Sequence, residues 1–273
     1  MKERGRRGEK LQAKDRGQRA ASSYFLLFTF YFLLVSCQQK PVTQIPQILN
    51  TYPHDAEAFT QGLVYANGKF YESTGLNGRS SLREVNIKSG EVIRGLALGD
   101  EYFAEGLAKV NNKLIQITWQ NGEVFVYDLE TFNKEKTFSY EGEGWGICYD
   151  GTDLYMSDGS GTLFERDPET FEVTRQITVK HNGQNVDELN ELECVDEFVY
   201  ANVWQTDQIL KVNKKTGLVV SEIDASLLLT SVERSQLGPD AVLNGIAYNA
   251  DTQSFYVTGK LWPKLFEVKF VEK

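Results

Sequence analysis

The sequence predicts an all-β fold, a five-bladed β-propeller, and three observations carry this prediction. Five segments of similar pattern recur at spacings of 40 to 54 residues. Each contains two short apolar strands joined by a turn of Asn, Asp or Gly, which is typical of a hairpin. A further hairpin follows the first four. Four strands in a unit of roughly 40–50 residues are typical of a propeller blade, and 273 residues suit one all-β domain.

The five units align on one position in the first strand of each. The aligned residues are Gly62, Gly106, Gly146, Glu191 and Gly245. The second strands are expected at 69–71, 113–117, 154–156, 198–200 and 255–257. The second hairpins are expected to begin at 82–87, 124–128, 163–166 and 209–212. Turn residues such as Lys88-Ser-Gly90 separate their strands.

The ends of this repeat predict how the ring closes. The fifth unit ends at 265–270 without a fourth strand, and residues 45–52 have no partner within their own unit. We expect this N-terminal strand to complete the last blade, which would protect the sheet edges. The long spacing before the fifth unit holds 224–237, whose cap residues and Leu/Val spacing predict one short helix.

The N-terminal 36 residues have the pattern of a lipoprotein signal peptide. Eight Lys or Arg and three acidic residues in 1–20 precede an uncharged, largely apolar run, as in a secretory signal. The run ends in Leu34-Val-Ser-Cys37, which resembles the lipobox of bacterial lipoproteins, where the Cys is lipidated. An uncleaved signal anchor is the alternative.

These features predict three segments: a signal peptide at 1–36, a tether at 37–44 and the propeller at 45–273. We expect the protein to be exported and anchored in a membrane by a lipid on Cys37. It would then lie on the periplasmic or cell-surface side of a bacterial membrane.

Composition argues against two classes of function. Two His and three Cys leave few ligands for zinc or for a His-rich catalytic metal, and a net charge of −9 argues against a nucleic-acid partner. Cys148 and Cys194 lie two and three residues past their aligned positions, and successive strand residues face opposite sides. We therefore expect two buried free thiols, and a disulfide or a nucleophilic Cys is the alternative. His54 and His181 fall in connecting segments and are expected at the surface or in turns.

Repeat symmetry brings polar and aromatic residues to one rim. Residues just before the aligned positions share that rim with residues at the ends of the second strands. They include Gln61, Glu105, Trp145, Asn190, Asn244, Trp119, Trp204 and Lys260. Exposed Trp is unusual without a ligand to cover, so the rim is a candidate binding site. In the alternative, the indoles pack under loops and the polar groups cap strand ends. Asp158 is expected to be a turn residue.

The same motifs resemble the plant and bacterial type of glutaminyl-peptide cyclotransferase. They are Phe59-Thr-Gln61-Gly62, Phe103-Ala-Glu105-Gly106-Leu107, Ile117-Thr-Trp119, Glu143-Gly-Trp145-Gly146, Leu189-Asn190-Glu191-Leu192-Glu193, Ala201-Asn-Val-Trp204 and Thr258-Gly-Lys260-Leu-Trp-Pro263. The resemblance implies a monomeric five-bladed propeller and an acyltransferase of the aminoacyltransferase class. That family converts the N-terminal Gln of peptides and proteins to pyroglutamate, releases ammonia, and uses neither catalytic zinc nor a cofactor.

The resemblance also implies residue roles. Glu105 is the proton-transfer carboxylate, Asn190 contacts the substrate, and Lys260 lies near the scissile amide. The substrate-binding residues are Phe59, Gln61, Trp119, Trp145 and Trp204. Burial among indoles would raise the pKa of Glu105, which suits a proton shuttle.

Other carboxylates and other functions compete with this interpretation. Glu143, Glu191 and Glu193 lie near the same rim or strand, and Glu191 is alternatively a structural ion-pair partner. A non-catalytic propeller lipoprotein that binds a ligand or protein on this rim is the main alternative function. A calcium-dependent lactonase-type propeller is a second alternative, but Lys260 would repel the cation.

Overall fold

The computed structural model describes residues 40–273 and contains almost only β-strands and turns. The expected signal peptide, 1–36, and the lipidation residue Cys37 lie outside the described residues, as does the start of the expected tether. The first strand, β1 (Val42–Pro53), begins within residues assigned to the tether. Within 40–273, no helix has the length and apolar character needed to cross a membrane. The prediction of an all-β fold is confirmed.

Three four-stranded antiparallel sheets follow in chain order, each a meander of neighbouring strands. The first contains β2 (Thr60–Ala66), β3 (Lys69–Thr74), β4 (Ser81–Val85) and β5 (Val92–Ala97). The second contains β6 (Ala104–Val110), β7 (Lys113–Thr118), β8 (Glu123–Asp128) and β9 (Lys134–Ser139). The third contains β10 (Ile147–Tyr149), β11 (Leu154–Met156), β12 (Thr162–Arg166) and β13 (Val173–Thr178). In the β2–β3 turn, Asn67 and Gly68 both have positive φ, as a two-residue hairpin requires.

The remaining long strands form one eight-stranded sheet in the order β16-β17-β18-β19-β1-β22-β21-β20. Its strands after β1 in the chain are β16 (Leu189–Val195), β17 (Phe198–Val203), β18 (Gln208–Asn213), β19 (Val219–Asp224), β20 (Leu243–Asn249), β21 (Ser254–Gly259) and β22 (Lys264–Glu272). A separate small hairpin joins β14 (Lys180–His181) to β15 (Gln184–Asn185).

Strand β1 pairs antiparallel with β22, as expected from the missing fourth strand of the last unit. Its first residues also pair in parallel with β19, from Val42 opposite Ser221 to Gln44 opposite Ile223. One N-terminal strand therefore covers two edges, which would otherwise expose unpaired backbone groups.

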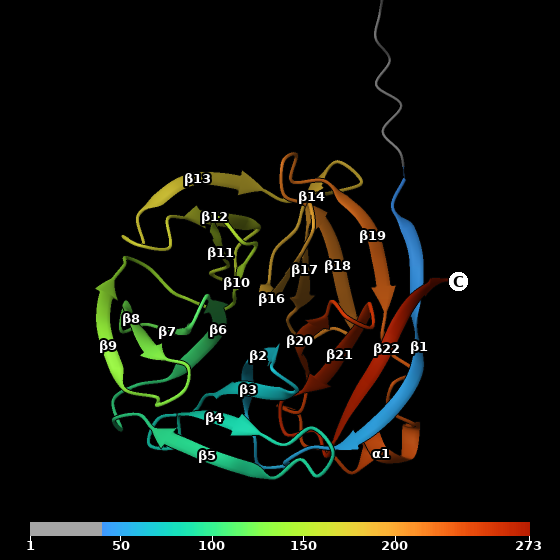
Figure 1. The fold of residues 1–273 in the computed structure, drawn as a ribbon. Helices are drawn as coiled ribbons and strands as arrows, with labels where there is room; N and C mark the ends of the chain where they lie inside the picture. The colour runs from blue at the N-terminus through green and yellow to red at the C-terminus, as the bar shows by residue number, and fades with distance from the viewer. Residues whose placement is uncertain (1–39) are drawn as a thin grey trace, which may run out of the picture. The chain divides into compact units, whose positions relative to one another are not determined.

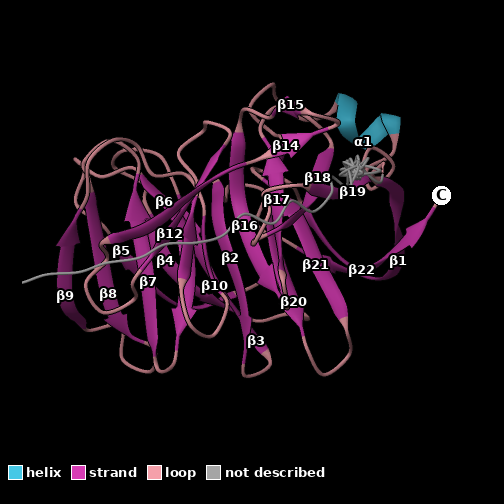
Figure 2. Cartoon of the chain, turned by 90° about the horizontal axis from the view of Figure 1, so that it is seen from above, coloured by secondary structure: helices cyan, strands magenta, loops and turns pink. Residues whose placement is uncertain are grey.

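The first strands of the successive units lie at the centre of the arrangement (Figure 1). They are β2, β6, β10, β16 and β20, each in contact with the next, and β20 contacts β2 again. The later strands of each unit lie farther out. The fold is therefore propeller-like. Figure 2 shows that strands make up most of the described chain and that helix α1 (Ser231–Ser235) is short.

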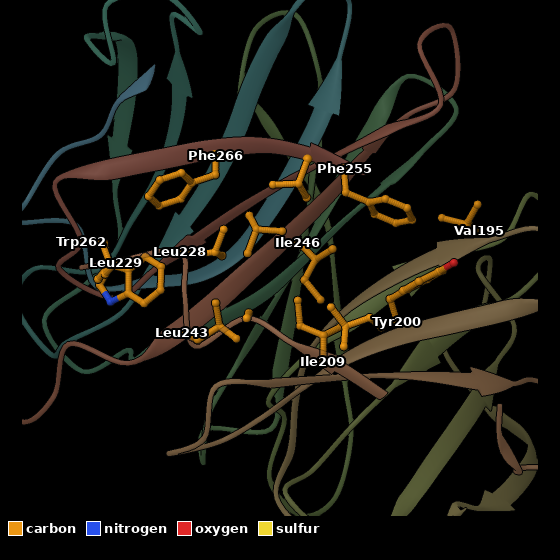
Figure 3. Close-up of a cluster of buried hydrophobic side chains, with 14 residues drawn as sticks. Val195, Tyr200, Ile209, Leu228, Leu229, Leu243, Ile246, Phe255, Trp262 and Phe266 are labelled. Carbon is orange, nitrogen blue, oxygen red and sulfur yellow. The ribbon is translucent and has the colours of Figure 1, made fainter. Parts of the chain in front are cut away.

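Hydrophobic cores fill the spaces between neighbouring units of the repeat. In the cluster of Figure 3, Ile209 from β18 and Ile246 from β20 are fully buried, and so is Trp262 in the turn after β21. Leu228 and Leu229, from the segment before α1 (Ser231–Ser235), pack into the same cluster. Burying each such side chain contributes about 1.5–3 kcal/mol. This packing docks the insertion that separates the fourth and fifth units.

The short helix α1 lies where the sequence predicts it. Thr230 caps its N-terminus, and Glu233 completes a capping box by accepting from the Thr230 backbone. Backbone N–H groups at the start of α1 therefore find hydrogen-bond acceptors within the insertion itself.

The expectation of two free thiols is wrong: Cys148 and Cys194 form a disulfide, with their Cα atoms 5.4 Å apart. Successive strand residues do alternate between faces. However, the face of one sheet packs against the other face of the next sheet, so that residues on unlike faces meet. A residue two positions past the aligned site in β10 therefore meets one that is three positions past it in β16.

His54 lies in the connecting segment after β1, as expected, but its side chain is not at the surface. Its side chain is 4% exposed and lies 3.0 Å from the Glu72 carboxylate. The His54 Nδ1 lies 2.7 Å from the Trp262 carbonyl oxygen. His54 follows β1 directly, so closure of the ring carries it against β3 and the turn after β21.

Candidate active site

One cavity of about 220 Å³ opens between the first strands, and every predicted rim residue from the resemblance lines it. Its walls comprise Phe59, Gln61, Phe103, Glu105, Trp119, Trp145, Asn190, Trp204, Gln205, Pro239, Asp240, Val242 and Lys260. Residues that are far apart in the sequence thus converge on one pocket. Cys37, the other predicted site residue, lies outside the described residues.

A repeated irregularity of the first strands directs the polar side chains. Pairing with the second strand shifts register at Thr60/Gly62, Ala104/Leu107, Leu189/Leu192 and Leu243/Ile246. Gln61, Glu105, Asn190 and Asn244 all lie within these bulges. β-bulges commonly re-aim side chains beside active sites, and here the repeat does so in four units.

The aligned glycines allow this crowded centre to form. A Cβ on Gly62 would lie 2.4 Å from the Leu107 nitrogen, and one on Gly106 would lie 2.6 Å from the Ile147 nitrogen. Both distances are too short for a side chain. At these two positions, therefore, only glycine lets the neighbouring first strands approach this closely, whereas in the fourth unit the aligned position is occupied by Glu191.

Glu105 is a buried carboxyl held by a polar chain. Gln61 Nε2 donates to Glu105 Oε1 at 2.8 Å. Asn244 Nδ2 donates in turn to Gln61 Oε1 at 3.2 Å and to the Thr60 carbonyl at 2.9 Å. The Gln61 amide is thereby oriented with its NH₂ group towards the carboxyl. Burial raises the pKa of Glu105 well above its ordinary value, Lys260 opposes this rise, and Glu143 adds to it.

Lys260 is 4% exposed and follows β21. Burial lowers its pKa to about 8, although the Glu105 and Asp240 carboxylates act in the opposite direction. Its Nζ lies 4.9 Å from the centre of the Phe59 ring, within cation–π range. Burial therefore favours the neutral amine of Lys260 more than water would.

Aromatic rings form the rest of the pocket wall. Phe59 and Phe103 meet edge-to-face at 6.0 Å, and Phe103 meets Trp119 at 5.7 Å. Trp145 and Trp204 meet edge-to-face at 5.5 Å. The three indoles are half-buried, so they present apolar surface to the cavity. Asn190 also lines the cavity, and its buried Oδ1 has no hydrogen-bond partner within residues 40–273.

Comparisons with known proteins show the family of this chain. A sequence model of the glutamine cyclotransferase family matches residues 27–270. The glutaminyl-peptide cyclotransferase of Arabidopsis thaliana is 43% identical over 225 residues, which are 82% of this chain and 70% of that protein. The chain belongs to the glutamine cyclotransferase family. The crystal structure of Myxococcus xanthus glutaminyl cyclase matches this glutamine cyclotransferase with a TM-score of 0.81 at 41% identity, covering 86% of this chain and 100% of that chain.

The competing carboxylates of this glutamine cyclotransferase have other surroundings. Glu191 is fully buried and accepts from the backbone nitrogens of Leu63, at 3.3 Å, and Ile246, at 2.7 Å. Its partners are thus backbone amides of two other first strands. Glu193 accepts from the Tyr248 nitrogen, and burial raises its pKa to about 8. Neither residue lines the cavity.

Two further acidic residues have local partners. Asp158 accepts from the Ser160 nitrogen and hydroxyl, which is the turn role expected from the sequence. Glu143 is not among the residues that line the cavity, and it accepts hydrogen bonds from the indoles of Trp119 and Trp145.

Some cavity residues were absent from the site predicted by sequence. Phe103 precedes Glu105 by two positions, as Phe59 precedes Gln61, so repeat alignment contained the signal. Pro239 and Asp240 come from the insertion after β19, which has no counterpart in other units and therefore no such signal. Within residues 40–273, no group of three or more His, Cys, Asp or Glu side chains is arranged to hold a metal ion.

Proposed function

We propose that this chain is a glutaminyl-peptide cyclotransferase, an acyltransferase that converts N-terminal Gln of peptides or proteins to pyroglutamate and releases ammonia. The observation that carries the proposal is the pocket itself. A buried Glu105 held by Gln61 faces a cavity walled by indoles and containing Lys260. Family membership and the 43% identical Arabidopsis relative support the same activity.

The reaction needs positioning more than strong chemistry. The substrate's α-nitrogen forms a bond to its own γ-carboxamide carbon, and that carbon's bond to the amide nitrogen breaks. Holding the two atoms in near-attack geometry can contribute about 7–11 kcal/mol to an ideally oriented reaction. The aromatic walls supply such a shape, and they exclude water, which would otherwise compete as a nucleophile.

Glu105 is the group we assign to proton transfer. An α-amino group has a pKa of roughly 7.7–8.0, so much of it is protonated near neutral pH. Glu105 takes a proton from this nitrogen and delivers one to the departing ammonia. A raised pKa brings the carboxyl closer to the operating pH, where such a shuttle is most efficient.

Lys260 and Asn190 are the groups we assign to the carbonyl oxygen. Negative charge develops on that oxygen as the ring closes. A donor placed against it is worth about 3–4 kcal/mol in comparable sites. Phe59, Gln61, Trp119, Trp145 and Trp204 bind the substrate in this proposal.

We further propose a five-bladed propeller acting as a monomer without metal or cofactor. The four-stranded meanders and the closed contacts of β2, β6, β10, β16 and β20 support the blade count. The Lys260 side chain, lining the same cavity as Glu105, would disfavour a divalent cation there.

Export and lipid anchoring through Cys37 remain part of the proposal. The signal pattern of residues 1–36 supports export, and so does the Cys148–Cys194 disulfide, because disulfides persist mainly in oxidising compartments. Replacing Cys37 by Ser should move the protein from the membrane fraction to the soluble fraction. Unchanged membrane association would contradict lipidation at this residue.

Ammonia release from a peptide with N-terminal Gln tests the activity. Wild type should release ammonia with and without a chelator, and the same peptide with an acetylated α-amine should release none. Glu105→Gln should lower kcat by about 10²–10⁴-fold with unchanged circular dichroism. Glu141→Gln, which changes an exposed carboxylate, is the matched control. Absence of ammonia from every N-terminal Gln peptide would favour the non-catalytic, ligand-binding alternative.

A further inference from the structure

We propose that Glu143 is a positioning residue, which joins two walls of the pocket by holding the Trp119 and Trp145 indoles. The expected effect of Glu143 on turnover rests on the proposed function. Its expected effect on the position of the indoles rests on geometry alone. Glu143 does not line the cavity. It acts through the Trp119 and Trp145 indoles, which do line the cavity.

One carboxylate oxygen receives both indole N–H groups. Trp119 Nε1 donates to Glu143 Oε2 at 2.7 Å, and Trp145 Nε1 donates to the same oxygen at 3.0 Å. Gln120 Nε2 donates to the other oxygen, Oε1, at 2.8 Å. Charge-assisted hydrogen bonds of this kind are about twice as strong as neutral ones. The carboxylate therefore fixes the N–H edge of both rings.

The two indoles come from different sheets. Trp119 follows β7 in the second sheet, and Trp145 precedes β10 in the third. Trp119 packs against Phe103, whereas Trp145 packs against Trp204. Glu143 thus links two aromatic groups on either side of a boundary between sheets. Burial alone would raise its pKa, but hydrogen bonds from Gln120 and the indoles lower it below the ordinary value.

The backbone around Glu143 is held as firmly as its side chain. Gly144 N donates to the Trp119 carbonyl at 2.9 Å, and Trp145 N donates to the Ser157 carbonyl at 3.0 Å. A Cβ on Gly144 would lie 2.2 Å from the Tyr140 hydroxyl oxygen, so a side chain there would require Tyr140 to move. These backbone hydrogen bonds fix the position of the Glu143 carboxylate. If the carboxylate were removed, this segment could not move to offer the indoles another acceptor.

Two substitutions separate positioning from simple structural support. Glu143→Ala removes the acceptor for both indoles. Glu143→Gln keeps one carbonyl oxygen for them while removing the charge. We expect Glu143→Ala to lower kcat/KM by about 10–100-fold, because misplacing reacting groups by 1 Å can cost about 10²-fold. Glu143→Gln should recover most of this loss. Glu141→Gln, two residues away and exposed, is the control.

Tryptophan fluorescence gives a readout that does not depend on turnover. Glu143→Ala should shift the emission of the folded protein, and the shift should shrink when Trp119 or Trp145 is already replaced by Phe. Glu143→Gln should shift it less. If wild type released no ammonia but these spectral changes appeared, the proposed function would fail while Glu143 would still hold the indoles.

Two results would overturn the proposal. One is Glu143→Ala with kinetics within twofold of wild type and unchanged emission. The other is Glu143→Gln as impaired as Glu143→Ala, because the carbonyl acceptor would then not be what the site needs. If the alanine variant fails to fold, the glutamine variant and a Gln120→Ala variant still test the same hydrogen-bonded group.

Discussion

Lys260 shows how burial changes the chemistry of a single side chain. Removal of its amine from water lowers the pKa of Lys260 to about 8. Burial in the same cavity raises the pKa of Glu105 well above its ordinary value. The lysine limits the rise at Glu105, because its positive charge favours the carboxylate. The charge on each group therefore influences the pKa of the other.

The pH dependence of activity should reveal this coupling. Removing the positive charge in Lys260→Met should raise the pKa of Glu105 further, so the acid limb of the kcat/KM profile should move to higher pH. Any limb near pH 8 that belongs to Lys260 should disappear. The measurement is kcat/KM against pH for both proteins. An unchanged profile would remove Lys260 from the site's electrostatics.

The positions of the polar pocket residues could be predicted because they recur at the same place in successive repeat units. Gln61, Glu105 and Asn190 each precede the aligned position of their unit, and that offset proved to be a bulge in each first strand. Asp240 was not predictable in this way, because it lies in the insertion. Its approach to the cavity depends on the docking of Leu228 and Trp262 in a shared core.

At the scale of elements, the end of β1 is secured by a buried charged group. Glu72 on β3 accepts from Thr60 Oγ1 at 2.6 Å and from Arg83 on β4 at 2.5 Å. His54 adds a contact to the same carboxylate. Burial disfavours charge on the imidazole, but Glu72 and the Trp262 carbonyl outweigh it, and the pKa of His54 is raised above 6.5.

This group predicts a pH dependence of stability. Because the folded-state pKa of His54 is raised, its contribution is fully present below about pH 6.5 and is lost as the pH rises through the folded-state value. His54→Gln should flatten that part of the stability curve and cost about 1–3 kcal/mol at pH 6, since Glu72 loses a partner.

Denaturant unfolding between pH 5.5 and 9 would check this prediction. His181→Gln changes the other histidine and serves as the control, which should keep the wild-type slope. Equal slopes for wild type and His54→Gln would contradict the assignment of this dependence to His54.

At the scale of the whole molecule, contacts between units close the ring. The Cys148–Cys194 disulfide ties the first strand of the third unit to that of the fourth. Glu191 then connects the fourth first strand, β16, to the backbones of β20 and β2. β1 completes the closure by pairing with β22 and β19. Each link joins segments that are distant in sequence.

Removing the disulfide should lower global stability. A Cys148→Ser, Cys194→Ser double variant should lose about 3 kcal/mol, mainly because its unfolded chain is less constrained. For a domain of this size, that loss corresponds to a fall in Tm of roughly 6–12 °C. Reductant should lower the Tm of wild type and leave the variant unaffected. Identical wild-type Tm values with and without reductant would show that the bond does not form.

The amino-acid pattern alone was enough to predict the strands, the hairpins, the completing role of β1 and the residue types that meet at the pocket. The strands and hairpins follow from local rules, because strand periodicity and turn chemistry act within one unit. The role of β1 and the shared rim follow from the repetition of that unit along the chain. The pairing of Cys148 with Cys194, the burial of His54 and the backbone partners of Glu191 were decided by tertiary structure. Each depends on which face of one sheet meets which face of the next, and that relation arises only when the units pack together.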